Sequence, residues 1–462
     1  MAIIGIDLGT TNSLVAAWTA QGPRLIENAL GDTLTPSAVS FDADGGAIVG
    51  RAALDRLISH PDRSVAGFKR MMGSARLVDI AGKSLRPEDL SALVLRALRE
   101  DAETALGEAV TEAVISVPAY FSDPQRKATL DAARIAGLKV ERLVNEPTAA
   151  ALAHSLEKQD GLFLILDLGG GTFDVSLLHK LDGMIEIKAS AGDVMLGGDD
   201  FSKLIAGEIA RRAGIPLSDL PPQAQARLRR AADDVKRILS DQHVAPYAFD
   251  LPDATVAGEM TRDAFETLAE PLMRRLRAPI EQAIADSRIA PGQIGQIVLV
   301  GGATRMPMIR AFVAKLFGRF PLLDPRPDHV IALGAATQMG LKARDAALDD
   351  VVMVDVCPFT LGIASFDGRV GRTIFSPIIE RNSVVPVSRN GLYQTLLDDQ
   401  EHITVKVLQG EDIRPERNIL LGTIDIAVPK GPAGRESVDV RFTFDINGVL
   451  IAEVTSLSTK ER

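Results

Sequence analysis

The chain has 462 residues, too many for one hydrophobic core, and its 46% hydrophobic and 24% charged residues are typical of a globular protein with several domains. The net charge of −10 argues against a nucleic-acid surface, and no apolar run approaches the roughly 18 residues of a membrane span. No basic stretch precedes an apolar core at the N-terminus, and the single Cys357 excludes an intramolecular disulfide, so we expect a cytoplasmic protein.

Two nearly identical motifs stand 160 residues apart (167 − 7), and each follows a short apolar run that predicts a strand. The motifs are DLGTT at 7–11 and DLGGGT at 167–172, and returning strands are predicted over 13–18 and 175–178. Glycines let backbone N–H groups approach an anion, and an aspartate at a strand end can hold Mg²⁺ through its water shell. The pair predicts a nucleoside triphosphate held between two lobes, although either motif alone also fits an ordinary turn.

Strand-like and helix-like stretches alternate over residues 1–346, which is typical of an α/β domain. Ser122 with Gln125 predicts a helix start, and Gly137 predicts its end. Pro147 suits the first turn of another helix that begins at Glu146. Charged helices are predicted within 202–240, and a buried strand over 296–300 is followed by a turn and a helix.

The pattern changes after Arg344. An apolar run over 351–354 is flanked by acidic residues, and beyond it apolar and polar residues alternate with a period of two, as over 403–407 and 438–444. Asn447-Gly448 predicts a hairpin turn before another strand. This part of the sequence predicts an all-β domain, a sandwich.

Taken together, these motifs resemble the DnaK-like heat-shock chaperones, the seventy-kilodalton family. The resemblance covers essentially the whole chain and rests on GIDLGTTNS (5–13), VPAYF (117–121), NEPTAA (145–150), DLGGGTFD (167–174), LGGDDF (196–201), VGGATRMP (300–307), LGI (361–363) and VLQGE (407–411). Within the family the chain looks most like the HscC-type branch, on details such as FSPIIERN (375–382). The region from Lys69 to Val117 is shorter than usual in the family, and the family's helical lid is not found before Arg462.

The resemblance implies an actin-like, two-lobed ATPase domain with duplicated ribonuclease-H-like cores over 1–346. An interdomain linker over 347–355 and an incomplete β-sandwich substrate-binding domain over 356–462 would follow it. The implied function is that of a molecular chaperone, which hydrolyses ATP to control the binding and release of unfolded, apolar polypeptide segments.

The implied site binds ATP or ADP with Mg²⁺, and K⁺ is a further candidate ion. The phosphates would contact residues of both hairpins and the following glycines: Gly9, Thr10, Thr11, Asn12, Gly169, Gly170, Gly171, Thr172, Gly197 and Gly198. Lys69, Glu146, Asp167 and Thr172 would be catalytic, and Asp7, Glu146, Asp167 and Asp174 would organise the metal and water. Without the resemblance, Lys69 reads as a solvated lysine, and Glu146 as a favourable charge at a helix start.

The adenosine would be held by two further segments, comprising Asp233, Lys236, Arg237 and Ser240, and Gly301, Gly302, Ala303 and Arg305. Lys236, Arg237 and Ser240 share a helical face by their spacing, and composition alone favours a solvated charged face there. The family often has glutamate where Asp233 stands.

The resemblance places a peptide pocket in the β domain, lined by Ile363, Phe366, Tyr393, Leu396, Ile403 and Val405. Their alternation alone fits inward-facing core residues equally well. Interdomain coupling is assigned to Pro118, Arg126, Arg142 and Asp355, for which a turn proline and surface charges are the plainer interpretation. The implied partners are unfolded polypeptides, a J-domain co-chaperone and a nucleotide-exchange factor, with no nucleic acid and no membrane.

Other classes of protein remain open from the sequence. An actin-fold ATPase or sugar kinase would share both hairpins but act on a small acceptor, and an actin-like filament protein would use ATP to control assembly. A chaperone whose β domain binds peptide poorly is a further alternative. The predicted linker and β domain argue against the kinase.

Overall fold

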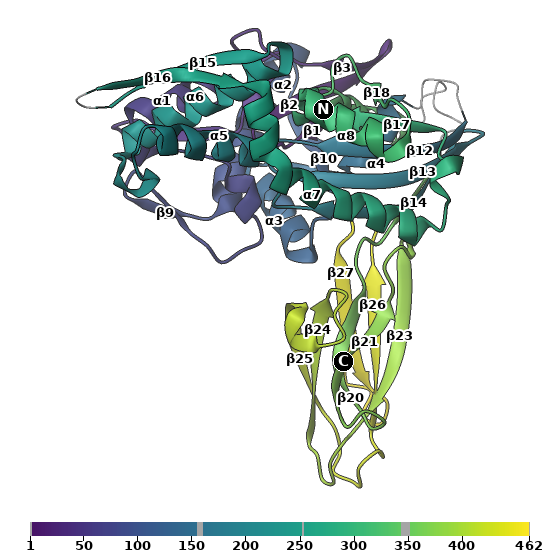
Figure 1. Cartoon of the computed structure of the whole chain (residues 1–462). Coiled ribbons are helices and arrows are strands. Elements are labelled where there is room, and N and C mark those ends of the chain that lie inside the picture. The colour runs from purple at the N-terminus through teal and green to yellow at the C-terminus, as the bar shows by residue number, and fades with distance from the viewer. Residues whose placement is uncertain (1, 155–159, 252–253, 343–351, 462) are drawn as a thin grey trace. The chain divides into compact units, whose positions relative to one another are not determined.

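The computed structural model describes residues 2–154, 160–251, 254–342 and 352–461 (Figure 1). The chain divides into two compact units: a first unit of Met1–Ala119 and Ala128–Met353, and a second unit of Tyr120–Lys127 and Val354–Arg462. The sequence-based domain boundaries remain a prediction, and residues 347–351 of the predicted linker lie outside the described residues.

The first unit contains two larger sheets, and the first of them is built around the first motif. Its strand order is β11 (Lys139–Asn145), β10 (Val110–Val117), β1 (Ala2–Asp7), β2 (Asn12–Thr19) and β3 (Gly22–Leu25). The short β4 (Thr35–Pro36) pairs with β2. β1 runs antiparallel to β2 and parallel to β10, so the predicted strand, turn and returning strand are present.

The second sheet repeats this arrangement around the second motif. Up to β14, its strand order is β18 (Leu322–Leu323), β17 (Gln296–Val300), β12 (Gly161–Leu168), β13 (Phe173–Leu181) and β14 (Met184–Asp193). β12 runs antiparallel to β13, with Asp167 opposite Asp174, and parallel to β17. The duplication read from the sequence is therefore a duplication of strand topology.

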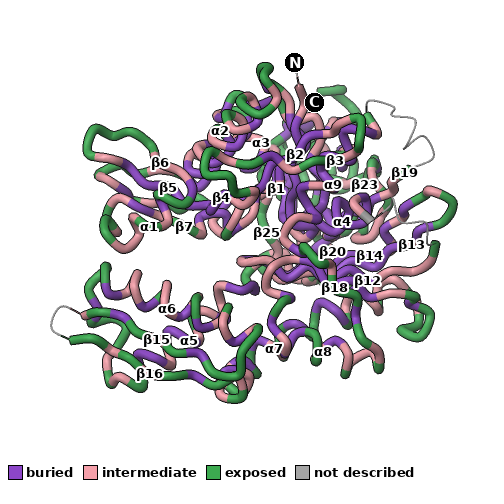
Figure 2. Tube along the Cα trace, turned by 90° about the horizontal axis from the view of Figure 1, so that it is seen from above, coloured by how far each residue is buried: buried purple, intermediate pink, exposed green. Residues whose placement is uncertain are grey.

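Two helices, α4 (Glu146–His154) and α9 (Val330–Lys342), connect the sheets. α9 packs on β1, β2, β3 and β10 of the first sheet. α4 packs on β10 and β11 of the first sheet and on β12 and β13 of the second, and the two helices contact each other. Both are buried along most of their length, as Figure 2 shows. At their closest approach, a Cβ at Gly334 would overlap the backbone carbonyl of Ala149, so only glycine fits there.

The other α-helices of the described chain are α1 (Arg51–Ser59), α2 (Pro87–Leu106), α3 (Asp123–Ile135), α5 (Gly198–Arg212), α6 (Pro222–Asp241), α7 (Arg262–Ser287) and α8 (Pro307–Phe317). α3 starts directly after Ser122 and ends before Gly137, as predicted. α5 to α8 bury their apolar faces with the second sheet in one core, where the rings of Phe201 and Phe265 meet edge to face at 6.3 Å.

In the described part of the first unit, three smaller sheets lie outside the two larger ones. They are β5 (Ala38–Phe41) with β6 (Ala47–Val49) and β7 (Ser64–Ala66), β8 (Val78–Ile80) with β9 (Lys83–Leu85), and β15 (Val244–Asp250) with β16 (Thr255–Thr261). The helices predicted within 202–240 correspond to α5 and α6. None of the helices in the described ranges is long and apolar enough to cross a membrane.

The second unit is built mainly from strands. One antiparallel sheet has the order β21 (Arg372–Ile379), β20 (Leu361–Asp367), β24 (His402–Gln409) and β25 (Ile419–Ala427). Another has the order β23 (Val387–Gln394), β26 (Ser437–Phe444) and β27 (Leu450–Ser456), and the turn before β27 contains the predicted Asn447-Gly448. Alternate side chains of both sheets enter one buried core, which also holds the thiol of Cys357.

The start of the predicted apolar linker run lies outside the described residues, and its end forms β19 (Val352–Val356). Within the first unit, the N–H of Val352 donates to the carbonyl of Gly183 at 3.2 Å. Within the second unit, Asp355 and Val356 pair with β22 (Val384–Val385).

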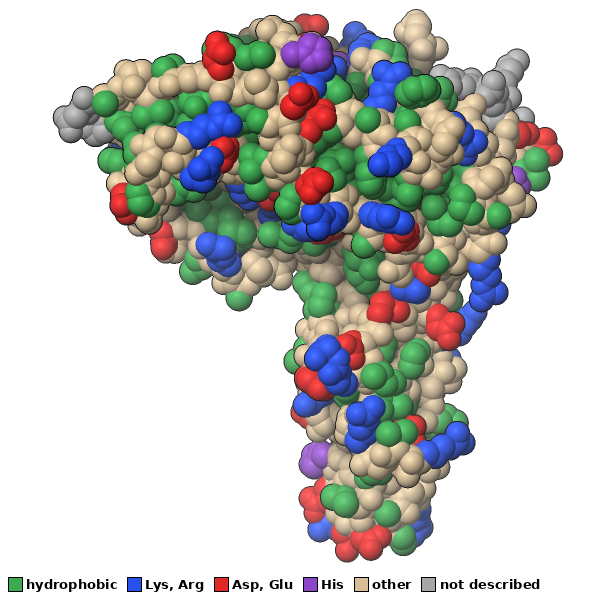
Figure 3. Space-filling view, viewed as in Figure 1, with side chains coloured by type: hydrophobic (Ala, Val, Ile, Leu, Met, Phe, Trp, Pro, Cys, Tyr) green, Lys and Arg blue, Asp and Glu red, His purple; other side chains and the backbone are tan. Residues whose placement is uncertain are grey.

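Acidic and basic side chains are interspersed over the face drawn in Figure 3, so the net negative charge is not gathered there.

Gly334→Ala is expected to destabilise the protein by about 1–3 kcal/mol, because the added methyl group must push α9 away from the backbone of α4. Urea unfolding of the first unit measures this. Gly207→Ala is the matched control, since Gly207 is also helical but a Cβ there meets no atom within 4 Å. We expect the control to stabilise by about 0.5–1 kcal/mol. Equal midpoints for Gly334→Ala and the wild type would show that this helix contact imposes no steric limit.

Candidate functional site

Two hairpin turns, one from each sheet of the first unit, lie in direct contact. A Cβ at Gly171 would overlap the side chain of Thr10, and one at Gly170 would overlap that of Thr11. The hydroxyl of Thr11 also donates to Asp199 at 3.3 Å, across the gap between the sheets. Glycine is therefore required in the second turn because another chain segment occupies the space of a side chain.

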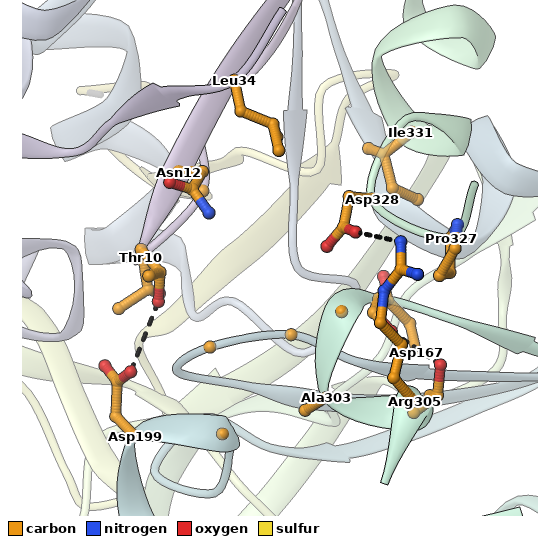
Figure 4. A pocket seen from close by; sticks show the side chains of 18 of the residues that line it. Thr10, Asn12, Leu34, Asp167, Asp199, Ala303, Arg305, Pro327, Asp328 and Ile331 are labelled. Atoms are coloured by element: carbon orange, nitrogen blue, oxygen red, sulfur yellow. Dashed lines mark hydrogen bonds and ion pairs between the residues drawn. The ribbon is translucent and has the colours of Figure 1, made fainter. Parts of the chain in front are cut away.

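The hairpins border a cavity of about 670 Å³ within the first unit (Figure 4). Predicted site residues that line it from the hairpins and their strands are Asp7, Gly9, Thr10, Thr11, Asn12, Asp167, Gly169, Gly170 and Thr172. Lys69, Glu146 and Gly198 line it as well. The cavity thus brings together residues that are up to 324 positions apart in the chain, from Asp7 to Ile331 (331 − 7).

Acidic side chains form the floor of this cavity. The pKa of Asp7 is raised to about 7, because burial and then nearby Glu146 raise it more than Lys69 and a hydrogen bond from Ser116 (3.0 Å) lower it. Burial likewise raises the pKa of Asp167, with Glu146 and Asp174 as the next causes. Buried carboxylates this close together repel one another and favour binding of positive charge.

Lys69 supplies positive charge at this floor. It belongs to a short 3₁₀ helix (Phe68–Met71), and its Nζ lies 2.9 Å from Glu146 Oε1 at the start of α4, with both side chains more than nine-tenths buried. The alternative interpretation of Lys69 as a solvated lysine is therefore wrong. A buried pair of this kind holds both partners in fixed positions, because breaking it would leave an uncompensated charge.

The donor set fits a hydrated magnesium ion better than a directly ligated metal. In the described part of the chain, no three Asp, Glu, His or Cys side chains lie close enough to hold a metal ion. Burial, and then Glu146, raise the pKa values of Asp7 and Asp167, so a cation bound beside these carboxylates would stabilise their charged forms. Mg²⁺ commonly keeps several of its waters, so carboxylates that are too far apart to ligate the ion directly can still bind the waters of its hydration shell.

The far end of the cavity is lined by the two segments predicted for adenosine: Asp233, Lys236, Arg237, Ser240, Gly301, Gly302, Ala303 and Arg305. The carboxylate of Asp233 accepts hydrogen bonds from Lys236 (2.7 Å) and Ser202 (3.1 Å) and pairs with Arg237 (2.9 Å). These cations keep the pKa of Asp233 below its usual value although burial opposes them. Lys236 and Asp233 are therefore an ordered part of the cavity wall, whereas the side chain of Arg237 is 64% exposed, as expected of a solvated charged face.

Three predicted site residues do not line the cavity. Gly171 packs against Thr10, and a Cβ at Gly197 would lie 2.5 Å from the backbone of Gly170. Both glycines therefore leave room for close packing around the second turn without contacting the cavity. Asp174 is buried opposite Asp167 on the neighbouring strand and acts on it through charge.

Several lining residues were not predicted from the sequence, among them Leu34, Asp199, Asp328 and Ile331. Asp328 accepts a hydrogen bond from Arg305 at 2.8 Å, as Figure 4 shows. Asp199 was visible in the LGGDDF motif, and burial raises its pKa. Leu34 and Ile331 carried no signal, because single apolar residues in a loop and in a helix are common.

The residues predicted for the peptide pocket divide into two groups. Ile363, Ile403 and Val405 are buried in the core of the second unit, in agreement with the alternative interpretation. Phe366 and Leu396 are 47% and 58% exposed. Tyr393 lies between these groups, partly buried, with its hydroxyl 3.3 Å from that of Ser376.

The four residues predicted for coupling occupy separate places. In the first unit, Pro118 is buried after β10, and Arg142 on β11 donates to Gln338 at 3.3 Å. In the second unit, buried Arg126 donates to the carbonyls of Phe121 and Asn447, each at 3.2 Å. Asp355 is buried on β19. The interpretation of Arg126 and Asp355 as surface charges is therefore wrong, and the coupling role of all four stays a prediction.

Asp7→Asn is expected to make stability less dependent on pH. Because the pKa of Asp7 rises from 3.8 to about 7 on folding, the native state binds the extra proton between these values. The free energy of unfolding should therefore fall as pH rises from about 4 to about 7, and the variant should lose part of that fall. Urea unfolding without nucleotide at about pH 5 and about pH 8 measures it. Asp62→Asn, at an exposed carboxylate, controls for loss of one charge. An unchanged decline in Asp7→Asn would contradict the assignment.

Comparison with models of protein families matches the Hsp70 family, described as Hsp70 protein, over residues 3–78 and 75–462. The match covers both hairpins, the acidic floor, the adenosine segments and the strands of the second unit. The chain belongs to the Hsp70 family.

Proposed function

We propose that the first unit binds MgATP in the cavity and hydrolyses it, and that this cycle controls how the second unit binds and releases unfolded, apolar polypeptide segments. One observation carries the proposal: both hairpins, Lys69 and the acidic floor line a single cavity of about 670 Å³. A cavity of this size is typical of small-molecule and cofactor sites. Members of the Hsp70 family are ATP-dependent chaperones, which agrees with the chemistry of this cavity.

The triphosphate would lie between the two hairpins. Backbone N–H groups of Gly9 to Asn12 and of Gly169 to Thr172 are the candidate donors to phosphate oxygens, and the threonine hydroxyls add to them. The adenosine would lie between α6 and the Gly301–Arg305 turn, where Lys236, Arg237 and Ser240 offer polar contacts.

Hydrolysis requires a water in line with the γ-phosphorus and stabilisation of charge on the phosphate oxygens. Lys69 would bind the γ-phosphate and orient that water, and the hydroxyl of Thr172 would donate to the same phosphate. Glu146 fixes Lys69 through their 2.9 Å pair, and Asp167 would hold the attacking water. Mg²⁺, when bound, neutralises phosphate charge. Asp7, Glu146 and Asp167 would hold its water shell, and Asp174 would act on Asp167 through its charge.

The second unit is proposed to be the β-sandwich substrate-binding domain. Its two sheets share one core, and exposed Phe366 and Leu396 are suited to contact an apolar side chain of an extended peptide. Ile363, Ile403 and Val405 would support these residues from the core. Tyr393 offers an aromatic ring and a hydroxyl at the border of the same region.

Regulation by partners follows from the same proposal. A J-domain co-chaperone and a nucleotide-exchange factor would act on the cycle, with Pro118, Arg126, Arg142 and Asp355 in the coupling between nucleotide and peptide. The described end of the linker run already forms a strand, β19, which suits a segment with alternative pairing partners. K⁺ as an additional ion and the HscC-type branch are further parts of this proposal.

Lys69→Ala is expected to retain ATP binding and to lose most hydrolysis, by about a hundredfold or more, because the γ-phosphate and the water lose their cation. Single-turnover hydrolysis of preformed complexes measures the rate, and equilibrium titration measures binding. Lys83→Ala, at an exposed lysine outside the cavity, is the control and should behave as the wild type. Near-normal single-turnover hydrolysis by Lys69→Ala would refute the role of this lysine.

The double variant Phe366→Ser, Leu396→Ser is expected to bind a labelled apolar peptide about tenfold or more weakly, because two side chains no longer bury apolar area against it. Fluorescence anisotropy measures this affinity. Ile451→Ser is the matched control, since Ile451 is 51% exposed on β27 and carries no predicted role. If both variants bound peptide as tightly as the wild type, this part of the proposal would fail.

A further inference from the structure

We propose that Arg70 is a positioning residue for ATP hydrolysis: it holds the second hairpin, through the carbonyl of Gly171, in the orientation that hydrolysis needs. The inference rests on the proposed function of the cavity. Arg70 follows Lys69 directly in the sequence but does not itself line the cavity.

The side chain of Arg70 makes four contacts with the second half of the first unit. Its Nε donates to the carbonyl of Gly171 at 3.0 Å, and its Nη2 lies 3.5 Å from that of Gly170. The two terminal nitrogens bind the two carboxylate oxygens of Asp200 at 3.0 and 2.5 Å. With only 9% of the side chain exposed, this is a buried, forked ion pair.

The N-terminus of α5 holds the same hairpin from the other side. The N–H of Gly198 donates to the carbonyl of Gly169 at 2.9 Å, and that of Asp199 donates to the carbonyl of Gly170 at 2.8 Å. Asp200 accepts the N–H of Gly197 at 2.9 Å, which fixes its carboxylate toward Arg70. Three successive carbonyls of the turn therefore have assigned donors, and Arg70 supplies the one for Gly171.

Holding these carbonyls also sets the N–H groups of the turn. In a trans peptide the C=O and the following N–H point in opposite directions. The bond from Arg70 to the carbonyl of Gly171 therefore fixes the N–H of Thr172 on the opposite side of that peptide. Thr172 lines the cavity, so Arg70 determines the direction of a donor in the proposed phosphate site.

Arg70 also affects Lys69 through the backbone. The two residues are adjacent in the 3₁₀ helix Phe68–Met71, and they bind Glu146 at the start of α4 and Asp200 on α5. This short helix is thus attached at two points, and loss of the Arg70 contact would let Lys69 shift. Lysine could not replace Arg70, because it lacks the planar fork that reaches a carboxylate and a carbonyl together.

The test compares Arg70→Ala, Arg70→Lys and Asp200→Asn in the full chain, with Lys203→Ala as the matched control. Lys203 binds the same carboxylate at 3.2 Å, but its side chain is 65% exposed and makes no bond to the hairpin. Four quantities are measured for each: the ATP dissociation constant, the single-turnover hydrolysis rate, that rate with added guanidinium ion, and the urea unfolding midpoint.

We expect Arg70→Ala to slow single-turnover hydrolysis about ten- to a hundredfold while ATP affinity changes less than about threefold, since the adenosine contacts and the first hairpin remain. Millimolar guanidinium should restore part of the rate in Arg70→Ala and none in Arg70→Lys. Asp200→Asn should show a smaller loss that does not add to that of Arg70→Ala in the double variant. Lys203→Ala should match the wild type.

Hydrolysis by Arg70→Ala within about twofold of the wild type would overturn the inference and leave the proposed function intact. Parallel loss of ATP binding and hydrolysis without guanidinium rescue would also overturn it, because that result indicates a structural role. A wild-type protein that binds no ATP would refute the proposed function itself, and the inference with it.

Discussion

Asp7 and Asp167 stand at the ends of strands from two different sheets, and burial forces their charges to share one small volume with Glu146 and Lys69. The pKa values of both aspartates are raised, mainly because burial removes water from their carboxylates. The two carboxylates therefore favour binding of a proton or a cation. The other features of the first unit serve this arrangement: α4 carries Glu146, a 3₁₀ helix carries Lys69, and the duplicated hairpins border the cavity above the acids. Like charges placed close together destabilise the folded protein. A cation that binds between them stabilises it, because the cation binds the native state and not the unfolded one.

Close packing at glycines keeps the two hairpins and the two central helices in contact, although the like charges of the acidic side chains repel one another. The glycines at 170 and 171 let the second turn contact the threonines of the first, and Gly334 lets α9 contact the backbone of α4. At each point a single methyl group would separate segments from the two sheets. The two halves of the first unit are therefore joined by close contacts at these glycines, and the relative position of the halves determines the shape of the cavity.

The sequence predicted those features that depend on local pattern. The hairpins follow from apolar strands and glycines, α3 from Ser122 and Gly137, and the strands of the second unit from period-two alternation. Residues whose role depends on distant partners could not be found in this way. From the sequence, Lys69 was interpreted as solvated and Arg126 as a surface charge. In the structure Lys69 pairs with Glu146, and Arg126 is buried. Asp328 and Arg70 gave no signal, because their partners Arg305 and Asp200 stand 23 and 130 positions away. Ile363, Ile403 and Val405 show the opposite case, in which plain alternation described their burial well.

Cys357 is the chain's one cysteine, and it lies in the core of the second unit. Burial raises the pKa of its thiol to about 12, so in the folded protein neither access nor ionisation favours attack on an alkylating reagent. Reaction of this thiol therefore requires that the second unit open. The natural sequence thus contains a chemical probe whose labelling rate reports the opening of one unit, separately from events at the nucleotide.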